Sequence, residues 1–342
     1  MDQGRIPIII VGYRNKVDIV GCLKALQGLI ERPKFDIYIC ENGGARAYEG
    51  LVRALLDHRG LCRPADTFGK SKLFDHQVRR VQALTLDRAN ARVLVAEAGE
   101  NLGYAGAINV WLRMLIKSDS AWPGVWILNP DTEPDSRALA ELVDWAEVRK
   151  LGMVGSRIVR MDRPDCIHSR GLRWRRLHSS AEAVDYLAAA GIEPDPDVIE
   201  RRIDAPSGAS IYVTRECLNG IGLMDDRYFL YFEDLDWGCC AKKCCGVGYA
   251  YKSIVPHRVG TTIGTPRGRR GSSRLSVYLE YRNRIHFVRK YHQSWLLWTV
   301  FVLFLRGLEY SIIGEPANMR AALKGLLAGL RGQTGRPDWM FD

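Results

Sequence analysis

Three carboxylates follow a run of aromatic residues in the stretch YFLYFEDLDWG, residues 228–238. Glu233, Asp234 and Asp236 would lose water beside those rings, and such burial of a carboxylate costs free energy unless something offsets it. Partial burial also raises the pKa of a carboxyl group, which makes it a better general base near neutral pH. Taken alone, the cluster leaves both a chemical role and a structural role open for these acids. The structural alternative is that all three cap a helix and pair with Lys or Arg, and Asp236 suits a helix N-terminus.

A second acidic stretch, NPDTEPD, follows an apolar run that ends at Leu128. In an open parallel sheet, ligands bind beyond the carboxyl ends of the strands, so the Asp131 carboxylate would face that crevice. Mg²⁺ typically binds one or two protein carboxylates together with substrate phosphates, which suits an acid at this place. Capping of the next helix is the alternative, and it explains Asp135 and Ser136 but not Asp131.

Strands and helices alternate along the first half of the chain. This order predicts an α/β fold with a mainly parallel central sheet and helices on both faces. The alternation fails after residue 160, so we interpret residues 160–205 as an inserted region. Apolar runs predict strands at residues 6–11, 35–40, 91–98, 124–128, 152–159, 209–214 and 246–257, and helical spacing predicts helices at 16–31, 48–58, 75–89, 136–150 and 275–292.

The net charge of +10 over 342 residues indicates an anionic partner, either a nucleotide, a phospholipid surface or a nucleic acid. The basic residues do not fall into a known nucleic-acid-binding signature, so we expect no nucleic-acid partner. Nine irregularly spaced cysteines favour a reducing cytoplasm over a secreted disulfide scaffold. The cluster at residues 239–245 lacks zinc spacing and is interpreted as small apolar residues on a helix.

The C-terminal part of the chain is apolar and basic. The run Trp295–Leu305 is too short to span a bilayer, but paired tryptophans and nearby cations are typical of an interfacial segment. A helix buried on the main domain, or on a second copy in a homodimer, is the alternative. The basic amphipathic stretch at residues 319–332 favours the membrane surface.

Six blocks of this sequence, in order, resemble family 2 glycosyltransferases, especially the bacterial rhamnosyl- and galactofuranosyltransferase-like members. The resemblance covers about residues 5–290. It includes the Arg282–Asn283 pair in YLEYRNRIHFVRKY. The blocks are IIIVGYRN, ICENGG, ENLGYAGAIN, WILNPDTEPD, SGASIYVTRECLNGIGLMDDRYFLYFEDLDW and VPH.

The resemblance implies a GT-A type nucleotide-sugar-binding domain over residues 1–265, with residues 160–205 on the acceptor side. A mobile basic loop, 266–274, and a C-terminal helical segment, 275–342, follow. It also implies inverting transfer of a sugar from a nucleotide diphosphate, with Mg²⁺ or Mn²⁺ as cofactor. The implied sites are catalytic Asp234 and Glu233; nucleotide-binding Gly12, Tyr13, Arg14, Glu41, Asn42, Asn101, Gly103, Asn109, Asn129 and Asp131; acceptor-binding Tyr231 and Trp237; and metal-binding Asp131 and His257.

The sequence departs from the family pattern at two places. Asn129 stands where a first acid often stands, and Glu41 stands where Asp is more usual. A non-catalytic nucleotide-sugar-binding or scaffold protein therefore stays the alternative to an enzyme. The expected enzyme uses dTDP-rhamnose or a UDP-sugar and a glycan or lipid-linked acceptor in cell-envelope polysaccharide synthesis. It would be cytoplasmic and peripheral to the inner membrane.

Overall fold

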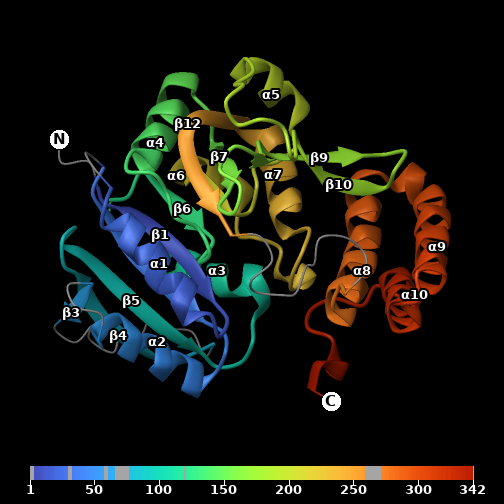
Figure 1. Ribbon diagram of the computed structural model, residues 1–342, viewed down its shortest axis with the longest axis horizontal. Coiled ribbons are helices and arrows are strands. Elements are labelled where there is room, and N and C mark those ends of the chain that lie inside the picture. Colours follow the sequence, from blue (N-terminus) through green and yellow to red (C-terminus); the bar gives the residue numbers. More distant parts are fainter. Residues whose placement is uncertain are drawn as a thin grey trace.

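A ten-stranded sheet runs through the part of the chain that the computed structural model describes, residues 4–29, 33–57, 61–65, 77–118, 121–258 and 271–341 (Figure 1). The strand order is β12-β7-β11-β6-β1-β2-β5-β4-β3, and β8 pairs with β7. The strands are β1 Ile6–Gly12, β2 Phe35–Glu41, β3 Cys62–Pro64, β4 Val78–Leu86, β5 Ala91–Ala98, β6 Gly124–Leu128, β7 Met153–Arg160, β8 Ile167–Ser169, β11 Ser210–Thr214 and β12 Val247–His257.

The middle of the sheet, β6-β1-β2-β5, is parallel, as is the β12–β7 pair. Alternate residues of β1 enter separate cores on the two faces, because side chains of a strand point to opposite sides. Ile8 and Ile10 lie in one core, and Ile9 and Val11 lie in the other. Such a strand needs apolar residues at every position, which explains the run at residues 6–11. The predicted α/β fold with a mainly parallel sheet is confirmed.

Helices cover both faces of this sheet and form a separate group at the C-terminal end (Figure 1). A small hairpin, β9 Leu172–Arg175 with β10 Ser180–Ala183, lies beside the main sheet. The helices are α1 Lys16–Leu26, α2 Ala45–Asp57, α3 Gly103–Lys117, α4 Ala138–Arg149, α5 Pro196–Arg202, α6 Arg215–Ile221, α7 Glu233–Cys244, α8 Arg274–Tyr291, α9 Leu296–Ile312 and α10 Pro316–Leu330.

The predicted helix at residues 75–89 is wrong. Residues 78–86 form β4, which pairs with β5 in antiparallel fashion from Val78 to Leu86. The side chain of Ala83 enters the core on one face of the sheet and that of Leu84 enters the core on the other face, so side chains alternate between faces as in a strand. The unpaired edge of β5 has backbone groups that need partners, and this tertiary demand outweighs the helical propensity of the segment.

The C-terminal helices pack through a core of their own. Gly325 and Gly329 of α10 lie against the α8 backbone, where an added Cβ would come within 2.3 Å of the Tyr278 carbonyl oxygen and 2.8 Å of the Arg282 carbonyl oxygen. Helix α9 continues through Arg306 and Glu309, so the segment Gln293–Ile312 is long and apolar enough to cross a membrane by length and composition. This helical segment is longer than the apolar run Trp295–Leu305, which the sequence analysis judged too short to span a bilayer. Residues 266–270 of the predicted basic loop lie outside the described residues.

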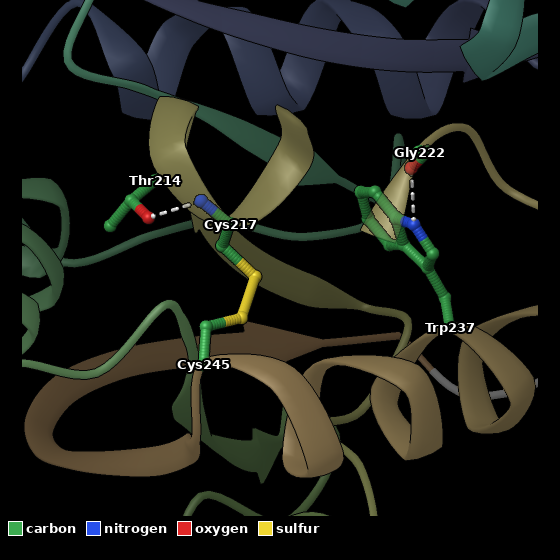
Figure 2. The surroundings of a disulfide bond; sticks show 5 residues. All are labelled: Thr214, Cys217, Gly222, Trp237 and Cys245. Carbon is green, nitrogen blue, oxygen red and sulfur yellow. Dashed lines mark hydrogen bonds between the residues drawn. A yellow bond between two sulfur atoms is a disulfide. The ribbon is translucent and has the colours of Figure 1, made fainter. Parts of the chain in front are cut away.

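A disulfide joins Cys217 of α6 to Cys245, the residue that follows α7 (Figure 2). The side-chain oxygen of Thr214 accepts a hydrogen bond from the Cys217 backbone N–H and so caps α6. This covalent link differs from the expectation of reduced cysteines. It ties the carboxyl end of α7 to the neighbouring α6.

Candidate functional site

The turn after β6 and the end of β12 bring Asp131 and His257 together. His257 Nε2 lies 3.1 Å from Asp131 Oδ1, and the Arg258 backbone N–H donates to the Asp131 carbonyl oxygen at 2.9 Å. The two residues are 126 positions apart in sequence, and the sheet order places both strand ends in one region. A carboxylate oxygen suits Mg²⁺ or Mn²⁺, and an imidazole nitrogen suits a transition-metal ion such as Mn²⁺ better than Mg²⁺. The pair fits a metal as two protein ligands, with the remaining positions left for substrate phosphates.

His168 of β8 lies beside this pair, and the sequence analysis did not identify it. Its Nδ1 is 3.0 Å from His257 Nδ1. Burial, together with the nearby charges of His257 and Arg160, lowers the pKa of His168 to about 4, so the ring is neutral at physiological pH. A neutral His168 can accept a hydrogen bond from His257 Nδ1–H and thereby leave His257 Nε2 available as a ligand. A single histidine inside a poorly patterned insertion carries no sequence signal for this role.

A chain of hydrogen bonds joins the Asp131 turn to Asp234. Tyr104 of α3 donates its hydroxyl proton toward Asn129 Oδ1 and the Gly208 carbonyl oxygen, each at 2.9 Å. The Gly208 N–H then donates to Asp234 Oδ2 at 3.2 Å. Burial, together with the charges of Glu233, Asp234 and Asp131, raises the pKa of Tyr104 well above its usual value. The two acidic stretches of the sequence therefore share one electrostatic environment.

The carboxyl groups of Glu233 and Asp234 differ in their surroundings at the start of α7. Glu233 is 4% exposed, and within the described residues its Oε2 has no hydrogen-bond partner. Burial and the adjacent Asp234 charge raise the pKa of Glu233 well above its usual value. Burial also raises the pKa of Asp234, but the backbone N–H groups of Leu235 and Gly208 oppose that rise. Asp234 is therefore the more readily ionised of the two, and Glu233 keeps its proton to a higher pH than an ordinary glutamate does.

A second polar group lies at the carboxyl ends of β1 and β2. Glu41 Oε1 accepts from the backbone N–H groups of Arg14 at 3.0 Å and Gly43 at 2.7 Å, while Oε2 is buried with no partner among the described residues. A cavity of about 530 Å³ adjoins this carboxylate. It is lined by Arg14, Lys16, Gly43, Arg46, Ala47 and Gly50. Its cations suit an anionic ligand.

Comparisons with known proteins bear on this geometry. No family model matches the chain. The chain is 26% identical over 247 residues to the N-acetylglucosaminyl-diphospho-decaprenol L-rhamnosyltransferase of two Mycobacterium tuberculosis strains. The match covers 64% of this chain and 75% of the relative.

Among solved structures, the chain resembles the mannosyltransferase PcManGT of Pyrobaculum calidifontis in complex with GDP-Man and Mn²⁺. The TM-score is 0.54 at 13% identity, over 97% of this chain and 88% of that chain. S. aureus TarS 1–349 gives a TM-score of 0.47 at 11% identity, over 96% of this chain and 92% of that one.

The chain is a glycosyltransferase with the GT-A fold. Its similarity to the mycobacterial relative agrees with the rhamnosyltransferase-like motifs read from the sequence.

The loop before α7 of this glycosyltransferase is held in a strained conformation. Phe229, Tyr231 and Phe232 have φ angles of 66°, 70° and 77°, a region that costs residues other than glycine about 1–3 kcal/mol each. The buried Asn283 Nδ2 lies 2.9 Å from the carbonyl oxygens of Tyr228 and Tyr231 and 2.8 Å from that of Leu230. Arg282 donates to the Tyr228 carbonyl oxygen at 2.9 Å. This Arg282–Asn283 clamp fixes the loop that leads into Glu233 and Asp234.

Two predicted ligand contacts of the glycosyltransferase are not compatible with the structure. Trp237 is 2% exposed in the core, where its Nε1–H donates to the Gly222 carbonyl oxygen at 3.0 Å (Figure 2), so it offers no face to an acceptor sugar. The buried amide of Asn109 donates to the Met224 carbonyl oxygen at 2.8 Å and accepts from the Met224 N–H at 3.1 Å. Asn109 therefore holds a loop and has no polar atom left for a nucleotide.

Among the other predicted binding residues, some hold the backbone of loops through hydrogen bonds and some are exposed to solvent. Asn42 Nδ2 donates to the Gly103 carbonyl oxygen at 2.9 Å, and Asn101 Oδ1 accepts from the Gly103 N–H at 3.0 Å. These bonds shape the loop before α3. Gly12 packs against Glu41, with an added Cβ only 2.6 Å from Glu41 Oε2. Tyr13 and Tyr231 are partly exposed and Arg14 is exposed. Asp236 forms an ion pair with Lys290 at 2.8 Å, as the structural alternative expected.

The raised pKa of Glu233 makes stability depend on pH. Above the ordinary Glu pKa, the folded state binds this proton while the unfolded chain releases it, so the free energy of unfolding falls as pH rises through the raised pKa. We expect Glu233→Gln, which cannot ionise, to raise Tm over wild type by an amount that grows as pH rises above the ordinary Glu pKa of about 4.3. Thermal unfolding across that range measures the difference. The control is Glu216→Gln, which changes an exposed residue of α6. If the Tm of wild type and that of Glu233→Gln change in parallel with pH, the pKa of Glu233 is not raised.

Proposed function

We propose that this glycosyltransferase is an inverting, metal-dependent enzyme of cell-envelope polysaccharide synthesis. The donor is dTDP-rhamnose or a UDP-sugar, and the acceptor is a hydroxyl of a glycan or lipid-linked saccharide. The relative named above acts on a diphospho-decaprenol-linked sugar, which favours the lipid-linked acceptor. The sugar transfer would take place at the cytoplasmic face of the inner membrane.

One observation carries this proposal. The Asn129–Tyr104–Gly208–Asp234 hydrogen-bond chain connects the turn that carries Asp131, a proposed metal ligand, to the Asp234 carboxylate. The metal-binding residues would lie at the donor diphosphate, and the Asp234 carboxylate would lie at the acceptor hydroxyl. A non-catalytic scaffold protein would need the metal-binding residues to hold a nucleotide sugar, but it would not need the Asp234 carboxylate.

In the proposed mechanism, Asp234 takes the proton of the acceptor hydroxyl as the new C–O bond forms. Glu233, which holds its own proton, can donate a hydrogen bond to an acceptor oxygen and keep the Asp234 charge in place. Attack from the Asp234 side, opposite the leaving diphosphate, inverts the anomeric carbon.

The donor end depends on different residues. Asp131 and His257 would hold Mg²⁺ or Mn²⁺, which would neutralise charge on the departing diphosphate. Glu41, with its free Oε2, would accept from the donor's base or ribose, and the cations of the adjoining cavity, Arg14 and Lys16, would attract its phosphates.

A thermal-shift screen of dTDP-rhamnose and UDP-sugars, with and without Mn²⁺, tests this function. A ligand that binds only the folded state stabilises it by about 2.7 kcal/mol at 100 times its Kd, which is a rise of a few degrees in Tm. We expect one nucleotide sugar to give a larger shift with Mn²⁺ than without it, and Asp131→Asn to remove the Mn²⁺-dependent part. If no nucleotide sugar raises Tm under either condition, the proposed function fails.

A further inference from the structure

A large cationic cavity lies away from the residues described above. It has a volume of about 750 Å³ and lies between the β9–β10 hairpin, the end of α5, and the carboxyl ends of α7 and α8. Seven of its lining residues are Arg or Lys, and Asp204 is the one acid among them. The cavity is larger than the one beside Glu41. Neither the base nor the metal-ligand pair uses it.

Several of the cavity cations have no carboxylate partner in the described part of the chain. Arg202 pairs with Asp185 at 2.6 Å and Lys242 with Asp204 at 2.9 Å, and Arg175 lies 3.8 Å from Glu182. No such ion pair forms at the others, which are Arg173, Arg176, Arg201 and Lys243. Uncompensated cations around one hollow repel each other, and a multiply charged anion relieves that repulsion. Arginine guanidinium groups also match phosphate geometry through paired hydrogen bonds.

An exposed apolar stripe borders the same hairpin. Trp298 Nε1–H of α9 donates to the Leu177 carbonyl oxygen at 3.0 Å, and Ser179 Oγ lies 3.0 Å from Thr299 Oγ1. Figure 1 shows the hairpin reaching toward the end of α9. We call the exposed apolar face of α9 the α9 stripe, and it consists of Leu297, Trp298, Phe301, Phe304, Leu305, Leu308 and Ile312.

The cavity and the α9 stripe together match an amphiphile with an anionic headgroup. Leu297 and Ile312 are 85% and 84% exposed, and Leu177 at the hairpin tip is 67% exposed, so apolar surface continues from helix to cavity rim. A soluble phosphate compound would use the cations but leave this apolar surface in water. A lipid uses both surfaces, because its headgroup enters the cavity while the stripe contacts the acyl region of the leaflet.

Helix α7 links this cavity to the base. Asp234 lies in its first turn, and Lys242 and Lys243 lie in its last turn. Eight residues of helix separate Asp234 from Lys242, a distance of about 12 Å along the axis. A saccharide attached to a headgroup phosphate fits that separation. We propose that the cavity binds the diphosphate of a lipid-linked acceptor while the α9 stripe lies on the membrane surface, an assignment that rests on the proposed function.

The test removes charge without breaking an ion pair. The triple variant Arg173→Gln/Arg176→Gln/Lys243→Gln changes three exposed cations of the cavity. The matched control, Lys24→Gln/Arg53→Gln/Arg88→Gln, removes the same charge from exposed sites on α1, α2 and the β4–β5 turn, on the other side of the molecule (Figure 1). Flotation with phosphatidylcholine vesicles that carry a polyprenyl diphosphate measures binding. At about 1 kcal/mol per basic residue near an anionic surface, the cavity variant should bind on the order of 100-fold more weakly, and the control should bind like wild type.

Further arms identify the anion and its source. Wild type should prefer the diphosphate vesicles over vesicles with phosphatidylglycerol at matched charge, and inorganic pyrophosphate should compete. Equal binding to phosphatidylglycerol vesicles, or no competition by pyrophosphate, would overturn the diphosphate assignment. Binding of pyrophosphate without binding of any vesicle would overturn the lipid assignment. So would a stable dimer in light scattering together with absent vesicle binding, because a second copy would then cover the α9 stripe.

The same variants separate this inference from the proposed function. Vesicle binding needs no donor, so it can be measured whether or not a nucleotide sugar raises Tm. A cavity variant that keeps the donor-induced rise in Tm and loses vesicle binding supports the cavity assignment. A cavity variant that binds the diphosphate vesicles as tightly as the control refutes that assignment and leaves the donor result unaffected.

Discussion

Replacing Asp234 with Asn is expected to lower kcat for sugar transfer by roughly 10³-fold while the donor still raises Tm, because general-base catalysis typically contributes 10²–10⁴-fold. Asn keeps the shape of the side chain, and its single oxygen can still accept from one of the Gly208 and Leu235 N–H groups. It cannot accept the proton of an acceptor hydroxyl. Initial rates of product formation at saturating donor, together with thermal shift, measure the two quantities separately.

Glu233→Gln is the matched control for Asp234→Asn. Burial and the adjacent Asp234 charge raise the pKa of Glu233 and favour its neutral form, which the amide of Gln resembles. We expect a loss of less than about tenfold, since the base itself remains. Wild-type kcat should rise with pH through the raised pKa of Asp234, and Glu233→Gln should keep that rise. The base assignment fails if Asp234→Asn transfers sugar at the wild-type rate, or if Glu233→Gln loses more activity than Asp234→Asn.

Asn283→Ala is expected to have the second largest effect, through the loop before α7. The substitution removes the amide that contacts the carbonyl oxygens of Tyr228, Leu230 and Tyr231. Leaving buried acceptors without a partner costs about 1–3 kcal/mol each, so we expect a loss of about 2–4 kcal/mol in the free energy of unfolding. The loop would also relax from its positive φ angles and shift Asp234, and a displacement of about 1 Å can lower kcat roughly 10²-fold.

A second buried asparagine separates stability from positioning. Asn318 of α10 donates to the Ser272 carbonyl oxygen at 3.0 Å and does not touch the loop before α7. Asn318→Ala should lower stability by about 1 kcal/mol and leave kcat near the wild-type value. Urea unfolding and initial rates, both taken well below the Tm of each variant, measure the two effects. An Asn283→Ala enzyme that is destabilised but retains full kcat would show that the clamp supports the fold without positioning the base.

The resemblance to family 2 glycosyltransferases implies that Asp131 and His257 lie together, and the order of the parallel strands explains why they do. Asp131 follows β6 and His257 ends β12, and the carboxyl ends of parallel strands meet at one edge of the sheet. The observed separation of 3.1 Å agrees with that prediction. The strained loop before α7 carries no comparable signal. Its conformation depends on Asn283, more than 50 residues away in sequence.

The sequence by itself determined the strand–helix order, the parallel centre of the sheet and the acidic stretches at strand and helix ends, because buried runs and polar turns are local properties. Tertiary structure alone decided which face of α7 enters the core. Gly238 lets α7 approach Ala205 so closely that an added Cβ would lie 2.2 Å from the Ala205 Cβ, and Trp237 is thereby buried while Asp234 stays partly exposed. The partnership of His168 with His257 and the pairing of β4 with β5 also depend on contacts between distant segments. Local sequence patterns do not encode these contacts, because the contacts stabilise the protein only after the distant segments have packed together.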